Sequence, residues 1–441
     1  MRKVDMQFDL IIINGLLMDP GFGFTKKADI GIKDGVIGRI FDEGKLTGKV
    51  IDKFPADVII DAKGAVVTPG FIDIHVHFRE PGFENKETIL TGSRAAAAGG
   101  FTSVCCMPNT QPAIDNQETV KFVTSLAEKG DCRVYCVGAI TKNREGMELS
   151  EIGDLVKAGV VAISDDGNYV QNPEIMRRAL EYSRMFDIPV ISHAEDEFLA
   201  AEGIMNESFT ATRLGMPGRP AVAEEIAIIR DIKLAGFTGG RLHIAHVSTA
   251  GGVEAIRRGK AEGVRVTAEV APHHFALTDD LIGERFDTNL RVSPPLRTER
   301  DRQAMIKGLI DGTIDCIATD HAPHTEEEKD VEFDQAPCGM IGLETSLGLA
   351  ITELADKGYL TLPDLIRKFT CNPATIVGLP CNSLREGETA DLTIFDPEAG
   401  WIVKKELLHS KSKNTPFSGW KLKGRVLATI MNGRITYQAA K

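Results

Sequence analysis

The chain has 441 residues, 43% hydrophobic and 26% charged, which is enough length for more than one domain and ordinary for a soluble globular protein. Its 51 basic and 63 acidic residues give a net charge of −12, which argues against nucleic acid binding because such binding needs a basic patch. No window reaches the roughly 18 apolar residues of a membrane span, and the first residues lack a signal-peptide pattern. We therefore expect no membrane association and a cytoplasmic location.

Residues 1 to about 68 predict β-structure. The runs DLIIING, ADIGIKDGVIGRI and ADVIIDAKGAVVTPG are short and apolar, and Asn-Gly, Asp-Gly and Lys-Gly pairs separate them as turns. After about Thr370 the pattern returns to β, with TADLTIFDP and GRVLATIMNGRITYQ. The simplest arrangement joins both ends of the chain, 1–68 and 376–441, into one small β domain.

The intervening residues, 69–375, alternate strands with helices. Most of the strands are continuous apolar runs, as expected of buried parallel strands. The expected helices lie at about residues 86–98, 117–129, 151–158, 174–185, 223–235, 252–262, 299–311 and 343–355. Eight strand-then-helix units predict an α/β fold of the (β/α)8 TIM-barrel type. A doubly wound open sheet is the alternative, but it would not usually need eight such regular units.

Two histidines one residue apart, His75 and His77, end the first barrel strand in the run FIDIHVHFREPG. Side chains alternate along a strand, so both imidazoles point the same way, as a shared metal ion requires. Arg79 follows at the same spacing. A guanidinium beside paired imidazoles indicates a carboxylate or phosphate substrate next to a metal.

The other histidines reinforce this interpretation. The chain has ten, and nine of them, all but His409, fall within the predicted barrel. All of those except His243 lie at or just past the C-terminal end of a strand, the rim where barrel enzymes carry their sites. The polar residues at these strand ends include Asn109, Asp165, Asp166, His193, His246, His273, His274, Asp320, His321 and His324.

Four histidines and two aspartates suit a pair of divalent ions, with zinc the first choice. An aspartate between the ions could bridge them, and a remaining carboxylate could shuttle a proton. Metal coordination lowers the pKa of water to about 7, so the site predicts hydrolysis of an amide or related carbonyl, or the reverse cyclisation.

Several polar residues favour structural interpretations. His243 and His321 are expected to be packed or structural, His273 and His274 are ambiguous, and Asp73 is expected to be a buried hydrogen-bond partner. The run EEEKD at 326–330 predicts a solvated loop. The eight cysteines form no CxxC pair, which argues against a zinc ribbon or thioredoxin motif, and most lie in apolar segments, as reduced core cysteines do. No glycine-rich phosphate motif indicates a nucleotide cofactor.

The blocks PGFIDIHVHFREPG, GGFTSVCCMPNTQP, ISDDG, HVST, SPPLR and TIDCIATDHAPHTEEEK together resemble the class I dihydroorotase family of the amidohydrolase superfamily. The resemblance runs from about residue 8 to the C-terminus. It implies reversible conversion of N-carbamoyl-L-aspartate to (S)-dihydroorotate in pyrimidine biosynthesis, with two zinc ions per subunit. We also expect a homodimer, and an association with an aspartate carbamoyltransferase is left open.

The resemblance also implies roles for individual residues. One zinc would be held by His75, His77 and Asp320, the second by His193 and His246, and Asp166 would bridge them. Asp320 would also be the catalytic general base. The substrate would be contacted by His77, Arg79, Asn109, Ser293, His324, Cys338 and Gly339, with Arg79, Asn109 and His324 on its α-carboxylate and the 337–339 loop meeting the ring through backbone groups.

This chain departs from the family at one substrate position. The family usually has Asn before PPLR, whereas this chain has Ser293, whose shorter side chain predicts a lost or water-mediated contact. Hydantoinase-like and allantoinase-like relatives bridge their metals with a carboxylated lysine on strand 4. That strand, VVAISDDG, carries no lysine, since Lys157 belongs to the preceding helix.

Two alternatives to an active dihydroorotase stay open. One is another cyclic-amide hydrolase, an allantoinase or dihydropyrimidinase, against which Arg79, Asn109 and the SDDG block count. The other is a catalytically silent scaffold for a carbamoyltransferase, against which the full set of six predicted ligands counts.

Overall fold

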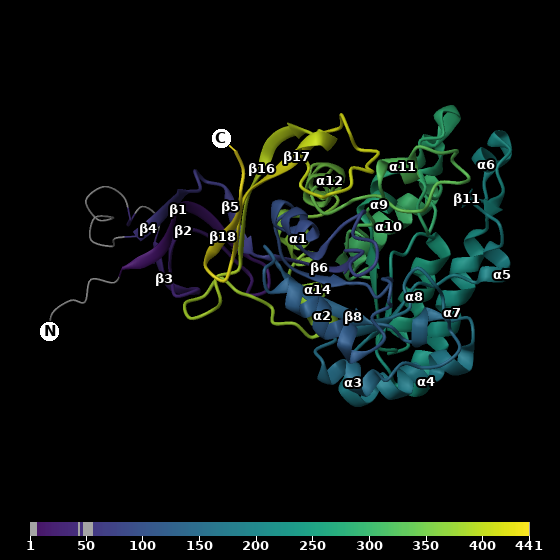
Figure 1. The fold of residues 1–441 in the computed structure, drawn as a ribbon. Helices are drawn as coiled ribbons and strands as arrows, with labels where there is room; N and C mark the ends of the chain where they lie inside the picture. The colour runs from purple at the N-terminus through teal and green to yellow at the C-terminus, as the bar shows by residue number, and fades with distance from the viewer. Residues whose placement is uncertain (1–6, 43–44, 47–55, 441) are drawn as a thin grey trace.

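The computed structural model describes residues 7–42, 45–46 and 56–440 of the chain. Figure 1 shows two bodies side by side: a barrel covered by helices, and a sheet built from both ends of the chain. No helix in the described ranges is both long and apolar enough to cross a membrane.

The barrel is an eight-stranded parallel sheet whose neighbours follow the order of the chain. Its strands are β6 Phe71–Val76, β7 Phe101–Cys106, β8 Arg133–Gly138, β9 Ala162–Ser164, β10 Val190–Ser192, β13 Leu242–Ile244, β14 Val266–Val270 and β15 Cys316–Ile317. A parallel bridge between Val76 and His321 brings the last strand back to the first and nearly closes the barrel. The predicted barrel is confirmed, and the open-sheet alternative is wrong.

Each strand is followed by a helix on the outside of the barrel. These helices are α1 Ile89–Ala98, α2 Gln117–Ala127, α3 Ile152–Lys157, α4 Pro173–Ser183, α7 Ala221–Thr238, α8 Ala250–Ala261, α10 Glu299–Asp311 and α12 Ser346–Ala350, the last continuing as a π-helical turn to Ala355. All eight overlap the predicted helices. Side-chain caps explain several starts: Thr88, Asn116 and Thr249 each accept a backbone N–H from the first turn of their helix. Two helices, α13 Leu362–Arg367 and α14 Cys371–Val377, follow the barrel.

Insertions at the C-terminal rim add short elements. They are α5 Glu197–Ala200, β11 Met205–Asn206, α6 Phe209–Leu214 and β12 Gly218–Arg219 after β10, α9 Pro272–Ala276 after β14, and α11 Glu326–Lys329 after β15. The predicted solvated loop at 326–330 is correct in exposure for Glu326, Glu327 and Asp330, but the run forms a short helix and buries its lysine. Thr325 caps α11, and the Lys329 side chain is buried, its ammonium donating to the carbonyls of Thr288 and Pro337.

The second sheet is mixed, with the order β18-β17-β16-β5-β1-β2-β3, and β4 also pairs with β1. Its strands are β1 Phe8–Asp19, β2 Phe24–Lys33, β3 Val36–Asp42, β4 Ala56–Asp61, β5 Val66–Pro69, β16 Leu392–Ile402, β17 Lys421–Met431 and β18 Arg434–Gln438. The two ends of the chain therefore do join, although the domain boundaries at 68/69 and 375/376 stay a prediction.

The predicted turns of this sheet are correct in three places and wrong in one. Lys63-Gly64, between β4 and β5, is a turn with positive φ at both residues. Asp34-Gly35 and Asn432-Gly433 both have positive φ at each residue and connect antiparallel strands, as their sequence favours. Asn14-Gly15 is not a turn, because β1 continues through it with a shift of register against β2. Asn14 takes a left-handed conformation there, and its N–H donates to the Asp29 carboxylate.

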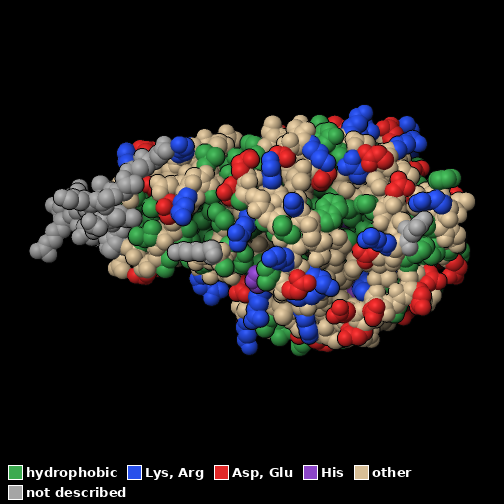
Figure 2. Space-filling view, turned by 90° about the horizontal axis from the view of Figure 1, so that it is seen from above, with side chains coloured by type: hydrophobic (Ala, Val, Ile, Leu, Met, Phe, Trp, Pro, Cys, Tyr) green, Lys and Arg blue, Asp and Glu red, His purple; other side chains and the backbone are tan. Residues whose placement is uncertain are grey.

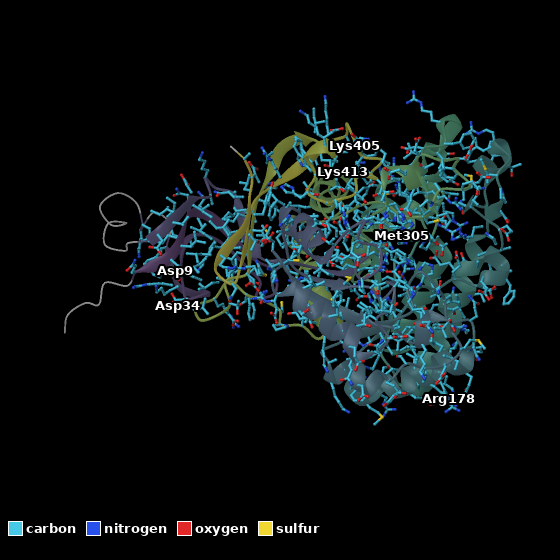
Figure 3. The ribbon with its side chains drawn as sticks, in the orientation of Figure 1. Asp9, Asp34, Arg178, Met305, Lys405 and Lys413 are labelled. Atoms are coloured by element: carbon cyan, nitrogen blue, oxygen red, sulfur yellow. The ribbon has the colours of Figure 1, made fainter. Side chains whose placement is uncertain are left out.

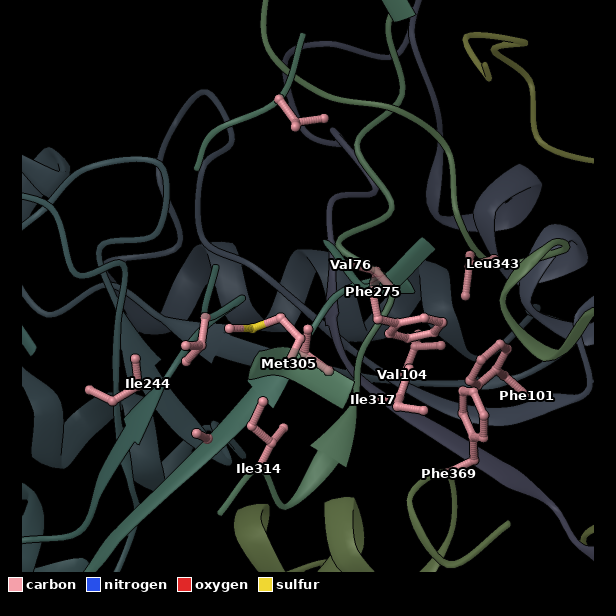
Figure 4. Packing of buried hydrophobic residues seen from close by; sticks show 14 of the residues in the cluster. Val76, Phe101, Val104, Ile244, Phe275, Met305, Ile314, Ile317, Leu343 and Phe369 are labelled. Carbon is pink, nitrogen blue, oxygen red and sulfur yellow. The ribbon is translucent and has the colours of Figure 1, made fainter. Parts of the chain in front are cut away.

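Apolar side chains fill the space between the barrel strands and the helices. Figure 4 shows Phe101, Val104, Phe275 and Phe369 among them, all fully buried. Five of the eight cysteines are buried and all eight are free thiols, as predicted for most of them. At the surface, Figure 2 shows acidic and basic side chains interspersed, with acidic groups frequent along the edge of the barrel.

Candidate metal centre and active site

The six predicted metal ligands come together at the C-terminal rim of the barrel. They are His75 in β6, His77 just after it, Asp166 after β9, His193 after β10, His246 after β13 and Asp320 after β15. All six are buried, with exposures between 0% and 7%, so water does not screen their interactions.

Asp166 lies at the centre of the group. Its Oδ1 is 3.4 Å from His75 Nε2, from His193 Nδ1 and from His246 Nε2, and its Oδ2 is 3.5 Å from His77 Nε2. Asp320 Oδ1 lies 3.1 Å from His77 Nε2 and 3.7 Å from His75 Nε2. One carboxylate thus contacts imidazoles from three strands, and a second covers the His75–His77 side.

The neighbouring Asp165 points elsewhere. Its carboxylate accepts the backbone N–H of Thr141 at 3.0 Å and the Thr141 hydroxyl at 2.5 Å, which holds the loop after β8. The lysine before this strand, Lys157, ends α3 at the surface and pairs with Asp154. Of the two aspartates in SDDG, only Asp166 contacts the histidines.

The donor atoms fit a divalent metal. Two clusters, His75–His77–Asp166 and Asp166–His193–His246, each bring their ligand atoms within 4.8 Å of one another and share Asp166. His75 Nε2 and Asp166 Oδ1 are buried with no hydrogen-bond partner, and His193 Nδ1 lies 2.9 Å from His246 Nε2. A buried imidazole nitrogen and a buried carboxylate oxygen that both lack a hydrogen-bond partner and face one another are what a bound cation would satisfy. The buried clusters therefore indicate a metal centre.

The electrostatics of the group favour positive charge at its centre. Burial disfavours a charged His75, but Asp166 and Glu269 outweigh it and raise the pKa of His75 well above its usual value. Burial also opposes ionisation of Asp166, yet His75, His193 and His246 hold the pKa of its carboxyl well below the ordinary range. Against the same burial, His77 and His75 lower the pKa of Asp320, so both aspartates are ionised near neutral pH.

Three predicted site residues have left-handed backbone: Arg79 with φ 64°, His246 with φ 31° and Asp320 with φ 49°. This conformation costs a non-glycine residue on the order of 1–2 kcal/mol. It persists where surrounding bonds enforce it, commonly at functional sites. Beside Asp320, the Thr319 N–H donates to both carboxylate oxygens of Asp73 at 3.2 Å, which confirms Asp73 as a buried hydrogen-bond partner.

The sequence did not reveal Glu269, a fully buried carboxylate in β14. It accepts hydrogen bonds from His75 Nδ1 at 2.5 Å, from His243 Nε2 at 3.1 Å and from the His246 N–H at 3.3 Å. The bond to Nδ1 leaves Nε2 of His75 free to face Asp166, the arrangement that orients metal-binding histidines. A glutamate inside an apolar barrel strand was the available signal, because a buried charge needs partners.

A cavity of about 320 Å³ opens beside the histidines. Its lining includes every predicted substrate-contact residue: His77, Arg79, Asn109, Ser293, His324, Cys338 and Gly339. Arg79 donates from Nε to the Pro323 carbonyl, and its Nη2 lies 3.4 Å from His324 Nε2. Asn109 Oδ1 lies 2.8 Å from His77 Nδ1. The cation predicted to bind an anion is thus next to the metal cluster.

The loop at 337–339 has its own internal bonds. The Gly339 N–H donates to the Arg291 carbonyl at 2.8 Å, so that N–H is already paired within the protein. The Cys338 carbonyl lies 2.9 Å from His324 Nε2. Gly339 has φ 134°, and a Cβ there would lie 2.7 Å from the Ala322 side chain, so only glycine fits. The Gly339 carbonyl accepts from Asn414, so within the described ranges a backbone contact from Cys338 and Gly339 to a substrate would fall to the Cys338 N–H.

The remaining histidines of the rim lie outside the two clusters. His321 Nδ1 accepts the Gly342 N–H, and His243 pairs with Glu269 and Thr267, so the structural interpretation of both fits their contacts. His273 and His274 are both buried, and His274 Nε2 donates to the Pro294 carbonyl. Burial lowers the pKa of His273 to about 4, which keeps that ring neutral.

Sequence comparisons with known proteins agree on one family, and the structural comparison finds the same fold in a related enzyme class. A family profile described as dihydro-orotase-like matches residues 64–251. A dihydroorotase of Pelotomaculum thermopropionicum is 53% identical over 97% of this chain and 98% of its own length, and one of Syntrophotalea carbinolica is 51% identical over 97% and 99%. Among solved structures, the L-hydantoinase (dihydropyrimidinase) of Arthrobacter aurescens is similar with a TM-score of 0.86 and 26% identity, over 98% of this chain and 97% of its own.

Proposed function

Because this chain belongs to the dihydroorotase family, with full-length relatives about half identical to it, we propose that the centre described above converts N-carbamoyl-L-aspartate reversibly to (S)-dihydroorotate and water. The activity itself is that of a dihydroorotase, a cyclic amidohydrolase. The finer proposal concerns the substrate, its place in de novo pyrimidine biosynthesis, the metal and the residues that act.

One observation carries the proposal: an ionised aspartate lies among four buried histidines, directly beside a cavity lined by Arg79. We propose two zinc ions, one held by His75, His77 and Asp320 and the other by His193 and His246, with Asp166 between them. Imidazole and carboxylate donors suit zinc. When bound, such ions supply Lewis acidity and lower the pKa of water to about 7.

Asp320 is proposed as the general base. Its carboxylate is ionised and lies 3.1 Å from His77 Nε2. Asp320 also lines the cavity, so the carboxylate can reach a substrate bound there. In ring opening it accepts a proton from the attacking water, and it returns a proton to the departing ring nitrogen. Ring closure uses the same steps in reverse.

Arg79, Asn109 and His324 are proposed to hold the α-carboxylate of the substrate. A guanidinium matches the planar geometry of a carboxylate. Burial and the neighbouring Arg79 lower the pKa of His324 to about 3, so His324 acts there as a neutral ring and Arg79 supplies the charge. His77, Ser293, Cys338 and Gly339 complete the proposed contacts.

We further propose that the protein is a cytoplasmic homodimer. Whether it associates with an aspartate carbamoyltransferase is a separate question. Sedimentation of the purified protein tests the dimer, since a monomer at micromolar concentration contradicts it. Co-purification with the carbamoyltransferase from the same organism tests the association.

The experiment that tests the function is an assay of purified protein, with metal analysis, against dihydroorotate, allantoin and dihydrouracil. We expect turnover of dihydroorotate and about two zinc equivalents per chain. Preference for allantoin or dihydrouracil would favour the other cyclic-amide hydrolases. Absence of turnover with the metal bound would favour the silent scaffold.

A further inference from the structure

Arg219 reaches the rim of the active site from the insertion that follows β10. It ends β12, which pairs in parallel with β11 through Asn206. Arg297, only 3% exposed, donates to the Arg219 carbonyl and to Asn206 Oδ1, each at 3.0 Å. The backbone of Arg219 is thereby fixed to the segment that contains Ser293.

The guanidinium of Arg219 is held on several sides. Its Nη1 donates to both oxygens of Glu195 at 3.1 Å, and its Nε and Nη2 donate to the Gly203 carbonyl. The same Nη1 lies 2.8 Å from Ser293 Oγ. Both members of the Arg219–Glu195 pair have side chains only 14% exposed. The structure therefore directs one fixed cationic donor at the Ser293 hydroxyl.

This contact decides the hydrogen-bonding role of Ser293. A hydroxyl has one hydrogen and two lone pairs, whereas arginine can only donate. Ser293 Oγ must accept from Arg219, so its hydrogen points elsewhere. Within the described ranges the Ser293 hydroxyl has no other hydrogen-bond partner, and the residue lines the cavity beside the histidines. A hydroxyl that accepts from a charged group is also a stronger donor.

We propose that Arg219 is a positioning residue that makes Ser293 a dedicated hydrogen-bond donor to the carbamoyl oxygen of the substrate. The inference rests on the proposed function. Arg79, Asn109 and His324 are assigned there to the α-carboxylate, and the reacting carbonyl belongs at the metal ligands. The carbamoyl oxygen is the remaining acceptor that the open-chain and cyclic compounds share. From the short side chain of Ser293 the sequence predicts that the substrate contact is lost or water-mediated. The proposal replaces that expectation with a direct hydrogen bond from the Ser293 hydroxyl to the substrate.

The test is a double-mutant cycle on the zinc-loaded enzyme, assayed in both directions. Ser293→Ala should raise KM about tenfold with kcat little changed, as loss of one hydrogen bond of about 1.4 kcal/mol predicts. Arg219→Met is made together with Glu195→Gln, so that the Glu195 carboxylate is not left unpaired. This double variant should raise KM by a similar factor. Adding these changes to Ser293→Ala should cost little more, because both remove the same interaction.

Two further measurements distinguish a positioning role of Arg219 from a general loss of structure at the site. In a Ser293→Asn variant the amide supplies its own donor, so the Arg219→Met, Glu195→Gln pair should no longer raise KM. With 2-thiodihydroorotate, whose sulfur is a weak acceptor, the wild-type preference for oxygen should shrink in Ser293→Ala. The control is Arg178→Met, on the outer face of α4 away from the rim in Figure 3, with a side chain 57% exposed, which should leave kinetics and zinc content unchanged.

Three outcomes would overturn the inference. The first is an unchanged KM in Ser293→Ala. The second is a further rise of about tenfold in KM when Arg219→Met and Glu195→Gln are added to Ser293→Ala. The third is a preference for dihydroorotate over 2-thiodihydroorotate that is as large in Ser293→Ala as in the wild type. Failure of the proposed function looks different, because the zinc-loaded wild type would then turn over neither carbamoyl aspartate nor dihydroorotate.

Discussion

Replacing Glu269 by Gln should weaken metal binding without unfolding the barrel. The carboxylate accepts from His75 Nδ1 at 2.5 Å, from His243 Nε2 at 3.1 Å and from the His246 N–H at 3.3 Å, and it is only 1% exposed. Glutamine has the same shape and keeps one oxygen as an acceptor. Its amide can face His243, which can change tautomer because Thr267 Oγ1 lies 2.8 Å from its other nitrogen.

The expected loss follows from these contacts. The glutamine keeps the bond that orients His75 but removes the negative charge that strengthens it. Changes to such supporting groups typically reduce metal affinity 10- to 100-fold, or about 1.4–2.7 kcal/mol. Burial opposes ionisation of Glu269, but His75 and His243 lower its pKa to about 2, so that charge is present throughout the neutral range.

Zinc affinity should be measured by competition with a chromophoric chelator at neutral pH, with thermal unfolding followed in parallel. Glu87→Gln is the matched control, because Glu87 is equally buried and contacts Ser410, Thr91 and His321, none of which is a predicted ligand. An affinity that is unchanged in Glu269→Gln, or equally reduced in Glu87→Gln, would refute the reasoning.

Four other outcomes are expected. Arg79→Ala should lower kcat/KM for carbamoyl aspartate about 100-fold, the loss of charge-assisted bonds worth roughly 3 kcal/mol, while zinc content stays intact; unchanged kinetics would remove it from the carboxylate site. Asp320→Asn should lower kcat by about 10²–10⁴, the range for general-base catalysis, and retention of most activity would exclude that role. Removing the metal with a chelator should abolish turnover and lower the unfolding temperature, and zinc should restore both. Burial lowers the pKa of Lys329 to about 8, so the stability of wild type relative to Lys329→Met should rise as pH increases from about 8 towards 10.5, and a flat difference in unfolding temperature would contradict this.

Local pattern was enough to predict the barrel and the position of its histidines. Apolar strand runs and helix-forming segments alternate eight times, and the register of His75 on β6 follows from strand periodicity alone. The rim clustering needs only the rule that parallel strands end at one face. Such features depend on neighbours along the chain.

Local pattern misled where a contact from elsewhere in the fold decides the conformation. Asn14-Gly15 favours a turn, but pairing with β2 carries β1 through it as an irregularity. The charged run at 326–330 suggests a solvated loop, but carbonyls of Thr288 and Pro337 bind the Lys329 ammonium and bury it.

Local patterns in the sequence predict the barrel, the sheet shared by both chain ends and the rim that carries the histidines and aspartates. Which buried groups pair depends on the folded arrangement of distant segments. Glu269 meets His75 across 194 residues of chain, and Arg219 meets Ser293 across 74. No periodicity records these contacts, because they depend on which strands and insertions the closed barrel places side by side.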